Sequence, residues 1–117
     1  MDKKKPIHSF EDLEVYKLAR EFSRKVGELI KRLPKEEDYN LKSQMRRAKL
    51  SVTNNIAEGF GRYHYQENIQ FCRQARGSLS ETLDHLICAN NEGYINDTKL
   101  NELREMYFHC LKFLPVK

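Results

Sequence analysis

Basic residues gather in the middle of the chain, and they are the side chains best suited to chemistry. Between Asp38 and Glu58 there are four basic residues and no acidic one, and three more arginines follow. Clusters of this kind bind the phosphates of nucleic acids, and the counterions that they release make the binding sensitive to salt. Seven side chains are therefore predicted to contact nucleic acid: Lys42, Arg46, Arg47, Lys49, Arg62, Arg73 and Arg76.

Aromatic residues accompany these cations and favour the same interpretation. Four of them lie near the basic residues in the sequence and could stack on unpaired bases: Tyr39, Phe60, Tyr63 and Tyr65. The charge spacing does not distinguish RNA from DNA. The alternative is a solvated helix face that keeps the protein soluble, since the net charge of the chain is only +4.

Residues 41–60 are predicted to form a helix with three distinct faces instead of two. The stripe expected to face the core comprises Leu41, Met45, Ala48, Val52, Ile56 and Gly59. A second side is polar and comprises Arg47, Ser51, Asn54 and Glu58. The third side is again partly apolar and comprises Arg46, Leu50, Thr53 and Ala57, with Phe60 beside it.

The additional apolar side of this helix indicates a further contact, because a surface helix needs only one apolar face. We predict an interface with another subunit, formed by Arg47, Leu50, Ser51, Asn54, Ala57, Glu58 and Phe60. The alternative is that Leu50 and Ala57 pack on a neighbouring helix of the same bundle, while Ser51 and Asn54 are solvated.

The remaining residue types give little support to metal binding or catalysis. His85 and Cys88 are three residues apart on a predicted helix, but a tetrahedral metal site needs four converging ligands. His109 and Cys110 are adjacent, so they point to different faces. The chain has no glycine-rich phosphate loop and no nucleophile motif. We therefore expect no metal, no cofactor and no enzymatic activity.

Four amphipathic helices are needed to position these side chains, over about residues 9–33, 41–60, 63–91 and 97–114. The inner stripe of the first comprises Val15, Ala19, Phe22, Val26, Leu29 and Leu33, and that of the third comprises Cys72, Ala75, Leu79, Leu83, Leu86 and Asn90. Ser9 and Asp12 are expected to cap the first helix, and Pro34 to stop it. Gly77 is expected to mark a close helix crossing.

Short connections make successive helices antiparallel neighbours, so the predicted fold is an all-α, antiparallel up-down-up-down four-helix bundle. The 117 residues fit one domain, residues 1–117, with residues 1–8 expected to be flexible. There are three cysteines, no signal peptide and no run of about 20 apolar residues. These features predict a reduced, cytoplasmic protein that does not enter a membrane.

The stretch from Gln44 to Arg62 resembles the hallmark of a bacterial four-helix bundle family, the 23S rRNA intervening-sequence proteins. Its Arg-Arg, Ser and Asn-Ile-Ala-Glu-Gly elements correspond here to Arg46, Arg47, Ser51, Asn54, Ile56, Ala57, Glu58 and Gly59. Further similarity lies in residues 10–16, 33–37, 71–81 and 93–95. The sequence departs from the pattern at Lys49, where an apolar residue is common.

The resemblance implies a bundle without enzymatic activity that assembles into rings, typically of five subunits. Relatives include accessory proteins of diversity-generating retroelements, which partner a reverse transcriptase and are expected to bind nucleic acid. The first hypothesis is therefore a ring-forming accessory protein that binds nucleic acid, with RNA favoured. The second is a helical adaptor for another protein, such as a reverse transcriptase or other neighbour-encoded protein, without nucleic-acid binding.

Overall fold

Four α-helices and two short 3-10 helices make up the structure, a computed structural model that describes residues 6–62 and 64–115. The elements in chain order are η1 (Phe10–Asp12), α1 (Glu14–Ile30), η2 (Lys35–Glu37), α2 (Leu41–Phe60), α3 (Tyr65–Asn91) and α4 (Asp97–Phe113). Most of the segment expected to be flexible, residues 1–5, lies outside the described residues, as does Tyr63.

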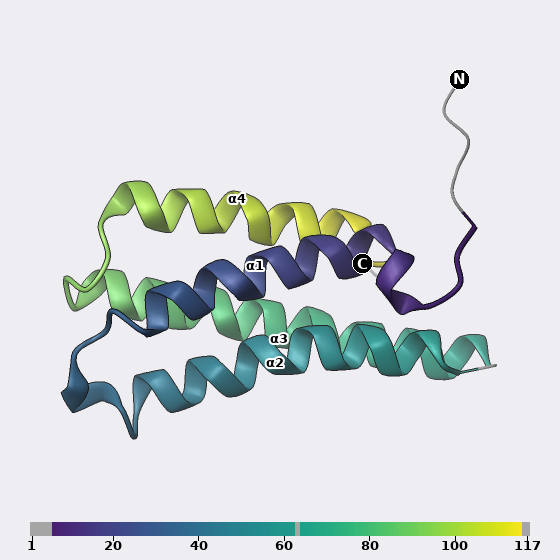
Figure 1. Ribbon diagram of the computed structural model, residues 1–117, viewed down its shortest axis with the longest axis horizontal. Helices are drawn as coiled ribbons and strands as arrows, with labels where there is room; N and C mark the ends of the chain where they lie inside the picture. Colours follow the sequence, from purple (N-terminus) through teal and green to yellow (C-terminus); the bar gives the residue numbers. More distant parts are fainter. Residues whose placement is uncertain (1–5, 63, 116–117) are drawn as a thin grey trace.

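The helices run alternately up and down and confirm the predicted all-α four-helix bundle (Figure 1). Each helix packs on the two that adjoin it, in the order α1, α2, α3, α4 and back to α1. Within the described residues, no helix is both long enough and apolar enough to cross a lipid bilayer. The N-terminal part of the chain and the end of α4 lie at the same end of the bundle as the turn between α2 and α3.

The start of the first helix differs from the prediction. Ser9 and Asp12 do form a capping box, in which the Asp12 carboxylate accepts the backbone N–H of Ser9 at 3.2 Å. This box caps η1 instead of α1, because Leu13 adopts an extended conformation (φ −71°, ψ 133°) that separates the two. The helix also ends earlier than predicted, at Ile30, since Leu33 precedes Pro34 and that position disfavours the helical conformation.

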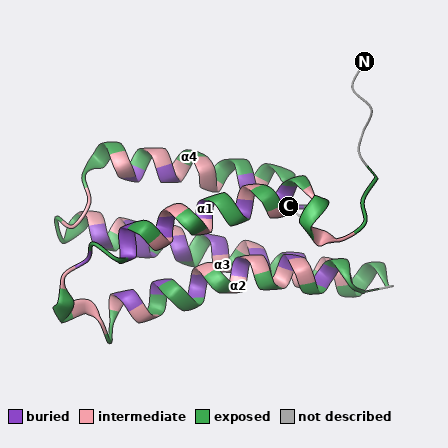
Figure 2. Cartoon of the chain, in the orientation of Figure 1, coloured by how far each residue is buried: buried purple, intermediate pink, exposed green. Residues whose placement is uncertain are grey.

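Figure 2 shows buried positions on all four helices, and the buried apolar residues form one core cluster. Phe22 of α1, Met45 of α2, Leu79 of α3 and Leu103 of α4 are each fully buried. The six residues of the stripe predicted for α1 are all buried. Hydrophobic spacing thus identified the inner face of this helix correctly.

The inner face of α3 is wider than predicted and partly polar. Leu83 and Asn90 are only half-buried, whereas Thr82, His85 and Ala89 are buried instead. The Thr82 hydroxyl can enter the interior because it donates to the backbone carbonyl of Ser78 at 2.8 Å. The buried face is wide because α3 contacts both α2 and α4.

The close helix crossing lies at Gly59, and the prediction that placed it at Gly77 is wrong. A Cβ atom on Gly77 would meet nothing within 4 Å, so this glycine is open to solvent. A Cβ atom on Gly59 would lie 2.7 Å from Oδ1 of Asn68 and 3.0 Å from Cβ of Phe71. The glycine at the end of α2 therefore allows the first turns of α3 to approach it.

Candidate nucleic-acid interface

Only some of the cations predicted to bind nucleic acid lie together in the structure. Lys42, in the first turn of α2, is buried. Its Nζ lies 2.6 Å from Oδ1 of Asp38, which precedes the helix. A buried cation that already has a carboxylate partner is not available to a phosphate. We therefore leave Lys42 out of the candidate interface, because its long aliphatic stem turned out to pack inside the bundle.

Arg62 is engaged in holding the turn between α2 and α3. Its guanidinium donates to Oε2 of Glu58 at 3.2 Å and lies 4.0 Å from the carboxylate of Glu67. It also lies over the ring of Phe71, 5.0 Å from the ring centroid. These contacts give Arg62 a local structural role, which the sequence interpretation did not separate from phosphate binding.

Arg73 and Arg76 lie on the side of α3 that faces away from α2. Both share that side with Ser80, which follows them by seven and four residues. The Ser80 hydroxyl lies 3.0 Å from the hydroxyl of Tyr107 on α4. The structure therefore does not bring these two arginines to the basic residues of α2.

The cations that do converge line a groove between α1 and α2, which we call the α1–α2 groove. It is lined by Gly27, Ile30, Lys31, Arg46, Lys49 and Leu50. Its three basic side chains come from both helices, and none of the described residues that line it is acidic. Within residues 6–62 and 64–115, none of these three cations forms an ion pair.

Lys49 lies across α1 at Gly27. A Cβ atom at Gly27 would lie 3.6 Å from Cε of Lys49, an ordinary van der Waals contact, so alanine would also fit and only a longer side chain would displace the lysine. In its present position the Lys49 ammonium lies 3.5 Å from the Ser23 hydroxyl, which accepts a weak hydrogen bond. The lysine head is thus held at the groove without a neutralising carboxylate.

Lys31 is the groove residue that sequence reasoning missed. Helical spacing places Lys31 outside the inner stripe of the first helix, and the residue is indeed exposed. The available signal was Gly27, which precedes Lys31 by four residues and therefore leaves the same side of α1 open. Only the placement of α2 shows that Lys31 stands beside Arg46.

Of the residues predicted to form a subunit interface, only those on the outward side of α2 lie together on the surface. Ser51 turns towards α3 in its own subunit, where it accepts from the Ser78 hydroxyl at 2.8 Å and from Nδ2 of Asn55 at 2.9 Å. Leu50 is 55% exposed and does not become buried on a neighbouring helix. We define the α2 outer face as Arg47, Leu50, Asn54, Ala57 and Glu58, of which only Ala57 is half-buried.

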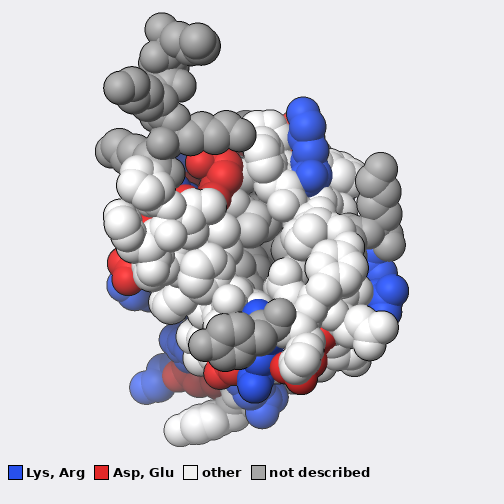
Figure 3. All heavy atoms as spheres, turned by 90° about the vertical axis from the view of Figure 1, so that its right-hand side faces the viewer, with Lys and Arg blue, Asp and Glu red and all other residues white. Residues whose placement is uncertain are grey.

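Phe60 lies apart from the α2 outer face, at one end of the bundle. It is 39% exposed and lines a shallow apolar hollow together with Leu13, Phe113 and Leu114. Figure 3 faces this end, where uncharged atoms fill most of the centre and charged groups stand around it. Phe60 and the α2 outer face therefore belong to different surfaces.

The cysteines show no sign of nucleophilic activation. Cys72 and Cys110 are buried, and burial raises the pKa of both thiols, to about 11 for Cys110. A thiol with a raised pKa stays protonated at neutral pH and is a poor nucleophile. Nowhere in the described part of the chain do three histidine, cysteine or acidic side chains come together as metal ligands.

Comparison with known proteins agrees with the resemblance in the sequence. No curated protein matches the chain. The family model described as 23S rRNA-intervening sequence protein matches residues 11–115, which is nearly the whole sequence. The family's description names no enzymatic activity. Because this match covers nearly the whole sequence, the chain belongs to the family of 23S rRNA-intervening sequence proteins.

Proposed function

We propose that this protein is a non-enzymatic accessory protein that binds RNA through the α1–α2 groove. The observation that carries the proposal is the convergence of Lys31, Arg46 and Lys49 on one groove whose described lining holds no acid. Unpaired cations attract phosphates because binding releases the counterions of the nucleic acid. RNA is favoured over DNA because the family takes its name from sequences within ribosomal RNA genes.

Assembly with further copies of the chain is the second part of the proposal. The α2 outer face exposes Leu50 between polar residues of both charges, which suits contact with another protein surface. Such a contact would place the α1–α2 grooves of successive subunits at regular intervals along a bound strand. The five-subunit ring implied by the resemblance stays a prediction, as does a neighbour-encoded partner such as a reverse transcriptase.

Neutralising the groove tests the RNA-binding part. The double variant Arg46→Gln/Lys49→Gln is expected to weaken binding of a generic single-stranded RNA by at least about tenfold at low salt. It should also reduce the slope of log K against log salt by about 1.4, since each lost phosphate contact on a single strand contributes about 0.7. Fluorescence anisotropy over a salt series, with RNA and with DNA of the same sequence, measures both quantities.

The matched control is Lys17→Gln/Lys112→Gln, which removes the same charge from exposed positions on α1 and α4, outside the groove. It should leave the salt slope within about 0.5 of the original value. Equal slopes for the two double variants would show that the groove has no special role. Wild-type protein that binds no RNA at low salt would remove the proposal altogether.

A charge in the middle of the α2 outer face tests the assembly. Leu50→Asp is expected to convert the oligomer to monomers, because a carboxylate buried without a partner in an interface is strongly unfavourable. Light scattering after size exclusion gives the mass directly. Phe108→Asp on α4 is the control, since Phe108 is similarly exposed at 53% but lies outside this face. An unchanged mass for Leu50→Asp contradicts the assignment, whereas wild-type protein that assembles but binds no RNA favours the adaptor function.

A further inference from the structure

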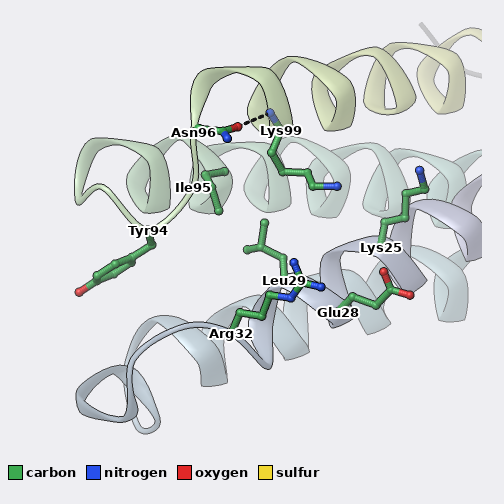
Figure 4. A pocket seen from close by; sticks show the side chains of 8 residues that line it. All are labelled: Lys25, Glu28, Leu29, Arg32, Tyr94, Ile95, Asn96 and Lys99. Atoms are coloured by element: carbon green, nitrogen blue, oxygen red, sulfur yellow. Dashed lines mark hydrogen bonds between the residues drawn. The ribbon is translucent and has the colours of Figure 1, made fainter.

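A second cationic hollow lies between α1 and α4, away from the α1–α2 groove. It is formed where the end of α1 meets the connection from α3 to α4, and its lining comprises Lys25, Glu28, Leu29, Arg32, Tyr94, Ile95, Asn96 and Lys99 (Figure 4). The cavity measures about 240 Å³, which suits a small ligand better than a protein segment. We call it the α1–α4 pocket.

Three basic side chains from two sides of the α1–α4 pocket face its interior. Lys25 and Arg32 come from α1 and the residues after it, and Lys99 comes from the first turn of α4. Among the residues that the structure describes, Arg32 has no carboxylate within ion-pair distance. Its guanidinium is therefore free to bind an anion with two parallel hydrogen bonds.

The two acids near the pocket are already paired. Glu28 lines the pocket, and its carboxylate forms an ion pair with Arg24. The carboxylate of Glu102 lies 2.7 Å from Nζ of Lys25 and 3.3 Å from Nζ of Lys99. These contacts lower the pKa of Glu102, mainly through its hydrogen bonds to Lys25 and Lys99. Glu102 thus holds both ammonium groups next to the pocket and competes with any anion that enters it.

We propose that the α1–α4 pocket binds a phosphate monoester. The free Arg32 guanidinium matches two phosphate oxygens, and the ammonium groups of Lys25 on α1 and Lys99 on α4 add positive charge to balance the dianion. Leu29 and Ile95 line the apolar part of the wall, which accommodates the organic portion of the ester. The phosphate can be that of a free nucleotide or of the 5′ end of an RNA chain.

Isothermal titration with adenosine 5′-monophosphate tests this site directly, with adenosine as the neutral control ligand. Arg32→Gln is expected to weaken nucleotide binding by at least about tenfold, because the forked contact is lost. Glu102→Gln is expected to strengthen it about fivefold, because Lys25 and Lys99 lose their internal competitor. A merely structural role for Glu102 would reduce thermal stability without raising the affinity.

The matched control is Lys17→Gln, which removes an exposed cation of α1 that lines neither the α1–α2 groove nor the pocket. Its nucleotide affinity should equal that of the wild type. Equal binding of adenosine and its monophosphate, or unchanged affinity in Arg32→Gln or in Glu102→Gln, would overturn the proposal. Circular dichroism of each variant ensures that a loss of binding is not a loss of fold.

The source of the phosphate can be identified by comparing the affinities of two otherwise identical RNA strands, one with a 5′-phosphate and one with a 5′-hydroxyl. Tighter binding of the phosphorylated strand by the wild type, but not by Arg32→Gln, identifies the RNA end as the ligand. Equal binding of both strands, with nucleotide binding established, identifies a free monoester. Arg46→Gln/Lys49→Gln should change RNA affinity and not nucleotide affinity, so failure of this proposal and failure of the proposed function are distinguishable.

Discussion

Replacing Phe22 with alanine is expected to lower the free energy of unfolding by about 3–5 kcal/mol. Phe22 is fully buried at the centre of the bundle, where α1 contributes to the shared core. Its removal takes away the transfer free energy of the ring and leaves a cavity that the surrounding helices fill only in part. Urea denaturation followed by circular dichroism at 222 nm, a standard wavelength for helices, measures the change.

Phe108→Ala provides the comparison for Phe22→Ala, since it removes the same ring from a side chain that is 53% exposed. We expect its free energy of unfolding to change by less than about 0.5–1 kcal/mol. Two variants of equal stability would mean that the four helices do not pack as described. An unchanged dependence of unfolding on urea in both variants would show that the denatured state is unaffected.

Gly59→Val is expected to have the second largest effect, a loss of about 1–3 kcal/mol. The new Cβ atom would lie 2.7 Å from Oδ1 of Asn68 and 3.0 Å from Cβ of Phe71, and the two γ-methyl groups of valine would add to this overlap. The amide of Asn68 can rotate away, but Phe71 is fixed to the backbone of α3. Relief therefore requires α2 and α3 to separate at their common turn, which thermal denaturation would detect.

Gly77→Ala is the control for Gly59→Val and should have the opposite sign. Gly77 lies in the interior of α3 with open space around its Cα atom, so a methyl group meets no obstacle. Alanine in place of glycine in a helix interior stabilises by about 0.5–1 kcal/mol. If both substitutions stabilised the protein, the close approach of α3 to Gly59 would be disproved.

Periodicity in the sequence was sufficient to predict most of the fold. The α1 and α2 stripes repeat every three or four residues without interruption, and helix geometry alone gives most of their buried faces. Two exceptions lie at the start of α2, where Leu41 is only half-buried and Lys42 is buried. The bounds of α2 were also predicted correctly, from Leu41 to Phe60. The break at Leu13 was not predictable, because the capping box that precedes it is compatible with either kind of helix.

The candidate interface was harder to predict, because helical spacing gives the angle of a side chain within its own helix and not the identity of its neighbour. Lys42 and Lys49 both lie on the α1 side of α2. Lys42 is buried and paired with Asp38, whereas Lys49 extends across α1 at Gly27. Arg73 and Arg76 are near the α2 cations in sequence but lie on the far side of α3. These differences depend on which helices adjoin, a property of the assembled bundle.

The hydroxyl pair between Ser51 and Ser78 has a consequence for the longitudinal alignment of α2 and α3. Apolar stripes repeat every turn, so sliding one helix by one turn, about 5.4 Å, would still bring hydrocarbon against hydrocarbon. Such a slip would separate the two serines, whose hydroxyl oxygens now lie 2.8 Å apart, and the hydrogen bond between the two helices would be lost, at a cost of about 0.5–1.5 kcal/mol. The hydrogen-bonded serine pair thus favours one longitudinal offset between α2 and α3 over others with nearly equal hydrophobic contact.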